Sequence, residues 1–290
     1  MPERYVATDA DGFEHFGARL RRWPLPLRSA DGWEPGAVVE PDELGVPETL
    51  DADGLLDELG EFIYVAEIVA DTGAVRLAAG TGWSETVAAG FALDCVGHVL
   101  GSVGAAAEAR LPGGGTLASV LEEARGFLAR GTATEGHRLG FMSRMAAARR
   151  LKRQGDEIGS AAFSEAARAE GEDLELMDDP VWETIAAAHE AVFAAIEAVR
   201  HVALPSLADR DTRRYEAREE SKLPKIDSVD TPWGLFPVGG GGPKYAPSWA
   251  AARDAAESAR KAVADAHGQS AGQAERTWQA LHLVSLFTID

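Results

Sequence analysis

Two carboxylate–histidine pairs at one-turn helical spacing are the residues of this sequence best suited to chemistry. Asp94 precedes His98 by four residues, and Glu197 precedes His201 by four. Glu190 lies two turns before Glu197. Side chains four residues apart share one face of a helix, so each pair could hold one metal ion. Because carboxylate and imidazole ligands from facing helices form di-iron sites in ferritin-like bundles, these five residues are candidate metal ligands.

Two features of these pairs count against a metal site. Di-iron bundles use Glu-x-x-His at a spacing of three, and that spacing is absent at both pairs. The three later candidates also fall beside the apolar stripe of their helix, and only His189 lies on it. A lone histidine on an apolar face is typical of a hydrogen-bonded core residue. Asp94 and His98 could likewise bond to each other, so the sequence assigns no catalytic residue.

A long helix over Pro180–Leu204 is the element that would position the three later candidates. Asp178 and Asp179 offer an N-cap, and proline is tolerated in the first turn, where a missing N–H leaves no bond unmade. Pro205 then ends the helix. Apolar residues recur every three or four positions along it and form one continuous face. We expect other helices to cover that face.

A second long helix, from its N-cap Ser84 through Arg110, would position the first pair. Gly90, Gly97 and Gly101 line up along one side of this helix. Each glycine in a helix interior is destabilising by about 1 kcal/mol relative to alanine. The clustering therefore predicts that a neighbouring backbone passes close to that side.

The segment Phe62–Ala79 allows two interpretations. Apolar residues at spacings of three and four continue into it from a helical pattern that begins at Asp53. Asp71-Thr72-Gly73, between two apolar runs, is instead typical of a hairpin turn. The spacing favours a helix over the hairpin.

Composition divides the chain into four parts. The N-terminal part is rich in Pro, Gly, Asp and Trp, which predicts irregular structure held on the domain by Trp23 and Trp33. The four parts are an irregular arm at 1–50, a helical bundle core at 51–222, a Pro/Gly-rich ordered loop at 223–247 and C-terminal helices at 248–290.

The Pro/Gly-rich loop contains aromatic residues that suggest a partner-binding surface. Structureless connections of this length are uncommon in compact domains unless they are functional or disordered. Trp233, Phe236 and Tyr245 indicate that the loop packs on something, and they are candidate partner-binding residues.

The net charge of −19 over 290 residues limits the kinds of partner. It argues against nucleic acid, whose phosphates repel an acidic protein, and it suits a basic protein partner. No apolar run is long enough for a transmembrane helix, and the N-terminus lacks a signal-peptide pattern. With Cys95 as the only cysteine, there is no internal disulfide or multi-cysteine metal site, and we expect a cytoplasmic protein.

Two short motifs carry a resemblance to a known family. The segment LDCVGHVL, Leu93–Leu100, is similar to the Leu-Asp-Cys-x-x-His-Val-Leu opening of helical immunity proteins of bacterial toxin systems. The Glu-Arg-x-Trp-Gln motif from Glu275 to Gln279 has the same character. The resemblance implies a bacterial helical protein that binds a protein partner, and it transfers no functional residue.

The sequence thus predicts an all-α fold, a multi-helix bundle with an irregular N-terminal arm and a long loop before two C-terminal helices. The favoured function is a non-enzymatic, acidic protein-binding protein of the immunity or adaptor kind, without a cofactor. The alternative is a metal-dependent helical-bundle enzyme. A helical scaffold that acts as a homo-oligomer is the third hypothesis.

Overall fold

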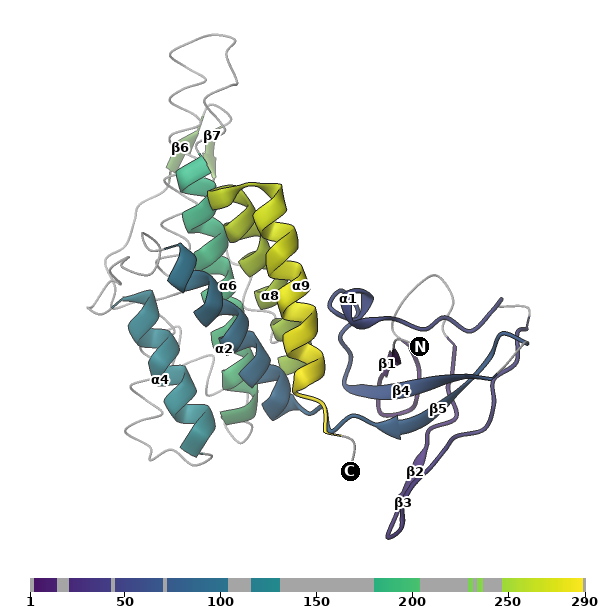
Figure 1. The fold of residues 1–290 in the computed structure, drawn as a ribbon. Coiled ribbons are helices and arrows are strands. Elements are labelled where there is room, and N and C mark those ends of the chain that lie inside the picture. Colours follow the sequence, from purple (N-terminus) through teal and green to yellow (C-terminus); the bar gives the residue numbers. More distant parts are fainter. Residues whose placement is uncertain are drawn as a thin grey trace.

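The computed structural model describes a helical bundle joined to a small β-sheet unit (Figure 1). The bundle contains the long helices, and the sheet unit contains the N-terminus of the chain. The described residues are 3–14, 21–42, 45–69, 72–103, 116–130, 180–203, 229–231, 234–236 and 247–288.

A three-stranded antiparallel sheet forms the centre of the sheet unit. Its strand order is β1-β4-β5, with bounds of Arg4–Thr8 for β1, Phe62–Val69 for β4 and Ala74–Gly80 for β5. The turn between β4 and β5 includes Gly73, whose φ of 73° suits glycine. Thr72 Oγ1 accepts a hydrogen bond from the backbone N–H of Ala74 at 3.1 Å. This turn therefore joins the two strands as a hairpin.

The helix predicted over Phe62–Ala79 is wrong, because this segment is the β4–β5 hairpin. Both faces of the sheet are covered, so its strands lack the alternation of apolar and polar residues that marks a half-buried strand. Ile63 packs with the helices on one face, whereas Tyr64 belongs to a separate apolar cluster on the other. Because apolar residues lie on both faces of the hairpin, their spacing of three and four along the sequence does not indicate a helix here.

The N-terminal arm forms strands rather than irregular structure alone. It contributes β1 to the main sheet and also a two-stranded hairpin, whose strands are β2 (Leu27–Ser29) and β3 (Gly32–Glu34). Trp23 is buried against the main sheet, as its predicted role as an anchor requires. Trp33 lies over Gly80, where a Cβ atom would come within 2.8 Å of its ring.

Six helices are present in the described part of the chain. Their bounds are Ala52–Leu55 for α1, Glu85–Ser102 for α2, Leu117–Arg130 for α4, Pro180–Ala203 for α6, Ser248–His267 for α8 and Gln269–Ser285 for α9. Ser84 is the N-cap of α2, because its side chain accepts a hydrogen bond from the backbone N–H of Val87. The predicted starts of α2 and α6 are confirmed, and α8 begins at the predicted start of the C-terminal helices.

Alanine-rich surfaces let the helices of the bundle pack closely. The most extensive contact joins α6 to α8, which run side by side in Figure 1. Ala195 on α6 and both Ala252 and Ala256 on α8 are fully buried. Small side chains allow the two helix backbones to approach, so this pair forms the centre of the bundle.

The sheet unit and the bundle share part of one hydrophobic core. The ring of Phe287, just after α9, makes edge-to-face contacts with Tyr5 of β1 and with Trp83. The backbone N–H of Thr288 donates to the carbonyl of Thr81 at 2.8 Å. Contacts from the C-terminal end of α9 therefore hold the sheet beside the helices.

The predicted all-α class is wrong. The described residues are 53% helical and 21% strand, which defines a mixed α/β fold. Strand pairing extends to the predicted loop at 223–247, where β6 (Val229–Thr231) pairs with β7 (Gly234–Phe236).

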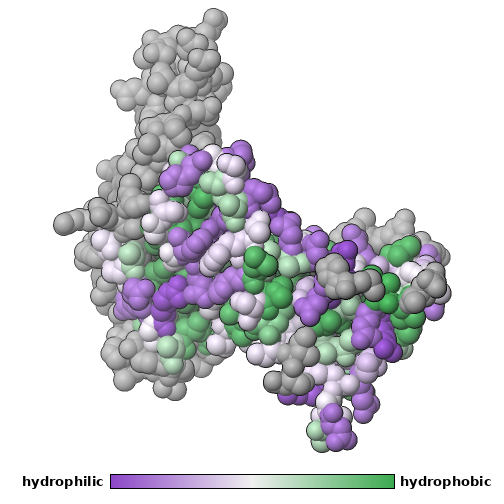
Figure 2. Space-filling model, viewed as in Figure 1, coloured by the Kyte–Doolittle hydropathy of each residue, from purple (hydrophilic) through white to green (hydrophobic). Residues whose placement is uncertain are grey.

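Hydrophilic residues cover much of the face shown in Figure 2, as the acidic composition leads one to expect. None of the helices described here has the length and apolar character needed to cross a membrane.

Candidate functional site

The first predicted pair, Asp94 and His98, lies on α2, but each side chain bonds to α9 rather than to the other. A hydrogen bond of 2.7 Å joins His98 Nδ1 to Oε2 of Glu275. A second, of 3.0 Å, joins Asp94 Oδ2 to Nε2 of His282. Each helix thus supplies one histidine and one carboxylate, and the two pairs lock α2 against α9.

Aromatic rings fill the space between these two pairs. Trp278 of α9 stacks on His98 at a centroid distance of 3.9 Å and on His282 at 4.9 Å. Phe91 continues the column at 6.1 Å from His282. The Glu275 side chain is only 4% exposed, so the carboxylate at this end is largely shielded from solvent, whereas the His98 ring is half-exposed. The main role of these rings and hydrogen bonds is therefore to hold α2 and α9 together.

The side chain of an arginine from α4 packs against one of the glycines on α2 and leaves no room there for a larger residue. Arg125 Nη1 donates to Asp94 Oδ1 at 2.6 Å, and its Nη2 donates to the carbonyl of Leu93 at 2.7 Å. A Cβ atom at Gly97 would lie 2.6 Å from this Nη2. The close neighbour is thus a guanidinium group, where the sequence predicted a backbone.

The other predicted metal ligands lie on α6. Glu197 is 7% exposed and Glu190 is half-buried, and both take part in polar interactions. The side chains of His201 and His189 lie outside the described residues. Among the residues that are described, no group of three or more His, Cys, Asp or Glu side chains is placed to hold a metal ion.

Cys95 lies next to the first pair and is fully buried. Burial raises the pKa of its thiol well above the usual value, and the nearby Glu275 and Asp94 carboxylates raise it further. A thiol that stays protonated is a poor nucleophile, so Cys95 is a structural residue.

The predicted partner-binding aromatics fall mostly outside the described residues. Phe236 is the last residue of β7, and its side chain is not among those described. Trp233 and Tyr245 lie outside the described residues altogether.

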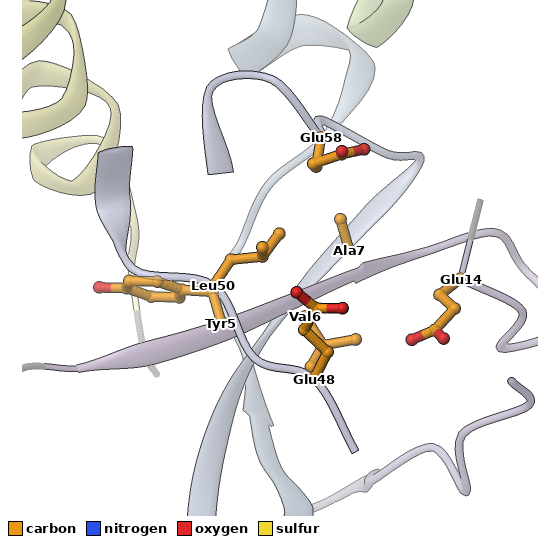
Figure 3. Close-up of a pocket in the computed structure, with 7 residues that line it drawn as sticks. All are labelled: Tyr5, Val6, Ala7, Glu14, Glu48, Leu50 and Glu58. Atoms are coloured by element: carbon orange, nitrogen blue, oxygen red, sulfur yellow. The ribbon is translucent and has the colours of Figure 1, made fainter. Parts of the chain in front are cut away.

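A pocket in the sheet unit gathers residues that the sequence analysis did not single out. Its volume is about 270 Å³, and it lies beside β1. Figure 3 shows Glu14, Glu48 and Glu58 placed around Ala7. The lining residues are Tyr5, Val6, Ala7, Glu14, Glu48, Leu50 and Glu58. An apolar floor and three carboxylates therefore share one cavity.

The carboxylates of this acidic pocket are partly desolvated. Burial raises the pKa of Glu14, and the hydrogen bond from Trp23 Nε1 at 2.8 Å opposes that rise. Burial also raises the pKa of Glu58. The charge of Glu48 adds to the rise at both residues, so Glu48 repels each of the other two carboxylates.

Two arginines, Arg21 and Arg253, lower the pKa values of Glu14 and Glu58 respectively, but each has a carboxylate partner of its own. Arg21 is buried and donates to both carboxylate oxygens of Asp42 and to the carbonyl of Gly45. Arg253 forms an ion pair with Asp254 at 3.7 Å. None of the residues that line the pocket in the described part of the chain is cationic. The pocket thus suits a positively charged ligand.

No local signal in the sequence could have revealed this pocket. Glu14 and Glu48 lie far apart in the N-terminal arm, and Glu58 follows the short helix α1. They meet only because β1 pairs with β4 and Leu50 pairs with Tyr5. A prediction of the site would have required the sheet itself.

Comparison with family models, with curated proteins and with solved structures found no match for this chain.

Proposed function

We propose that this chain is a non-enzymatic binding protein of the immunity or adaptor kind, which holds a basic segment of a partner protein in the acidic pocket. The observation that carries the proposal is the cavity of about 270 Å³ with an apolar floor and three glutamates. Lysine and arginine side chains combine an aliphatic stem with a charged head. The stem can lie along Leu50, which is only partly buried, while the head reaches the carboxylates.

The charge of the whole chain supports the same partner. A net charge of −19 attracts basic proteins over a distance and raises their rate of association. The desolvation of Glu14 and Glu58 strengthens the attraction of the pocket for a cation, because charges interact more strongly away from bulk water. An arginine can also bond two carboxylate oxygens at once.

A peptide titration tests the proposal. The probe is an acetylated and amidated pentapeptide, Thr-Ala-Arg-Ala-Thr, and its control carries citrulline, a neutral isostere, in place of arginine. We expect calorimetry to show binding of the arginine peptide and binding of the citrulline peptide that is weaker by roughly tenfold or more, equivalent to about 1.4 kcal/mol. Equal affinities for the two peptides, or binding of neither, would overturn the proposal.

A pair of charge-matched variants locates the binding. The first replaces the three pocket carboxylates by Glu14→Gln, Glu48→Gln and Glu58→Gln. The second removes three exposed carboxylates elsewhere, by Asp31→Asn, Glu34→Gln and Glu40→Gln. Both variants remove three negative charges, but only the first changes the pocket. We therefore expect only the first variant to lose affinity for the arginine peptide. An equal loss in both would reduce the effect to net charge and contradict a specific site.

A further inference from the structure

A short stretch of antiparallel pairing in the N-terminal arm places Glu14 next to Trp23. The backbone N–H of Glu14 donates to the carbonyl of Arg21 at 3.1 Å. The backbone N–H of Trp23 donates to the carbonyl of Gly12 at 2.8 Å. Alternate residues of paired strands lie on one face, and diagonal neighbours are within reach of long side chains. The side chains of Glu14 and Trp23 therefore meet on the same face.

The two side chains are joined by a hydrogen bond whose donor is held in the core. Trp23 Nε1 donates to Glu14 Oε2 at 2.8 Å. The Trp23 ring is 1% exposed and packs in the apolar cluster that contains Tyr64 and Leu77. Because the packing fixes the indole, a glutamate side chain bonded to it loses most of its rotational freedom.

The second oxygen of the Glu14 carboxylate remains for a ligand. An indole has a single N–H donor, so Trp23 bonds only one of the two oxygens. Oε1 receives no hydrogen bond from the described part of the chain. Figure 3 shows the Glu14 side chain directed from the edge of the pocket toward Val6 and Ala7. The carboxylate is thus held in place, with one oxygen left for the pocket.

We propose that Trp23 is a positioning residue of the acidic pocket, which holds Glu14 Oε2 so that Oε1 is available to the basic side chain of the partner segment. This inference rests on the proposed function and adds to it a buried residue that does not itself touch the partner. A glutamate that is fixed in advance loses less side-chain freedom when the partner binds. The bond is also charge-assisted, because its acceptor is an ionised carboxylate.

The same hydrogen bond affects the pH range in which the pocket binds. Burial raises the pKa of Glu14, the Trp23 hydrogen bond and Arg21 lower it, and the charge of Glu48 raises it. Since the bond from Trp23 favours the ionised carboxylate, its removal should raise the pKa further. Glu14 would then be protonated at a higher pH, and affinity for a basic segment would begin to fall at a higher pH.

Two substitutions at position 23 remove the indole N–H. Trp23→Phe keeps an aromatic ring in the core. Benzothienylalanine at the same position keeps the size of the indole, with sulfur in place of N–H, and serves if the phenylalanine variant does not fold. Trp33→Phe is the control, because Trp33 lies over Gly80 and does not line the pocket.

Calorimetry with the peptide Thr-Ala-Arg-Ala-Thr measures the effect of these substitutions. Both Trp23 variants should bind the peptide roughly three- to tenfold more weakly than the parent protein, and the control should bind it equally well. In the Trp23 variants, the loss of affinity on acidification should also begin at a higher pH. A loss of packing alone would not move this pH dependence.

A double-mutant cycle shows whether Trp23 acts through Glu14. In the Glu14→Gln background, the substitutions at Trp23 should change the affinity by less than about twofold, because no charge is left to position. An equal loss in both backgrounds, no loss in either, or an unshifted pH dependence would overturn the inference. The proposed function would still stand if the parent protein preferred the arginine peptide to the citrulline peptide. Without that preference, both fail together.

Discussion

His98 of α2 and Glu275 of α9 are joined by a hydrogen bond of 2.7 Å, and the indole of Trp278 lies flat against the same imidazole. The Glu275 carboxylate also accepts from Gln279 Nε2 at 3.0 Å through its other oxygen. Both carboxylate oxygens are thus used at a nearly fully buried position. This residue orders the contact between α2 and α9.

Replacing Glu275 by alanine should destabilise the fold. The change leaves the buried Gln279 amide without one partner and frees His98, so we expect the free energy of unfolding to fall by about 1.5–3 kcal/mol. His267→Ala is the control, because His267 is exposed and makes one long contact with the Ser102 carbonyl, and it should change stability by less than about 0.5 kcal/mol. Urea unfolding measures both. Equal stabilities of the two variants would contradict the buried role of Glu275.

Two glycines of α2 should respond differently to alanine. Nothing lies within 4 Å of a Cβ atom at Gly101, so Gly101→Ala should raise the free energy of unfolding by roughly 0.5–1 kcal/mol. At Gly97 the new methyl group meets the Arg125 guanidinium and pushes it away from Asp94, so this gain should be lost or reversed. Thermal unfolding of the two variants checks the difference, and an equal rise in both would show that Arg125 moves aside freely.

Sequence reasoning located the helices because their signals are local. Ser84 and Pro180 mark the starts of α2 and α6, and both act within one turn of their own position. The sheet was missed because β1 and β4 are separated by more than fifty residues, and buried apolar residues lie on both faces of the sheet. Pairing between distant strands leaves no local pattern.

The candidate residues on α2 show the same limit. The spacing of Asp94 and His98 correctly placed them on one helix, but it could not reveal their partners on α9. Glu275 lay in a motif noted only for a resemblance to other proteins. The acidic pocket could not be predicted from the sequence, since Glu14 and Glu58 are brought together by the tertiary fold.

Glu58→Gln should stabilise the protein and weaken binding. Burial raises the pKa of Glu58, with smaller increases from Asp57 and Glu48 and a decrease from Arg253. Since the folded state holds this proton more tightly than the unfolded state, stability increases as the pH falls through the raised pKa. A neutral glutamine removes that pH dependence, and at pH 7 it should raise the free energy of unfolding by up to about 1 kcal/mol. Urea unfolding at several pH values measures it, with Glu34→Gln as the control.

The affinity for a basic peptide should follow the same titration in the opposite direction. Protonation of Glu14 and Glu58 removes the charges that attract the peptide, and their raised pKa values place this loss above the usual pH range of a glutamate. Affinity should therefore fall as the pH is lowered through that range. An affinity that stays constant between pH 7 and pH 4 would contradict the role of the carboxylates.

The ion pairs of Arg276, on α9, should contribute to the way the stability of the molecule depends on acidic pH. Arg276 bonds Asp53 at 2.8 Å and both oxygens of Asp57 at 3.0 and 2.8 Å, which ties α1 to the bundle. Its hydrogen bonds lower the pKa of Asp57, so this stabilisation is present above the unfolded pKa of an aspartate and is lost as the pH falls through the lowered value. Arg276→Lys should lower the free energy of unfolding by up to about 1 kcal/mol at neutral pH. It should also make that free energy depend less on pH in the acidic range.

The matched control for Arg276 is Arg76→Lys, at an exposed ion pair with Glu67 on the sheet. This variant should leave the curve of stability against pH nearly unchanged, because exposed pairs contribute little. Chemical unfolding between pH 7 and pH 3 compares the two variants. If the stability of the Arg276 variant and of the parent protein depended on acidic pH in the same way, the proposed contact between α1 and α9 through Arg276 would be contradicted.

The central claim, that a basic side chain sits among the pocket carboxylates, is tested most directly by a double-mutant cycle. Calorimetry measures the affinity of the arginine and citrulline peptides for the parent protein and for Glu48→Gln. If the guanidinium group contacts this carboxylate, the change to citrulline should weaken binding to the parent protein about fivefold more than binding to the variant, a coupling of about 1 kcal/mol. The same factor for both proteins, with no coupling, would contradict the account.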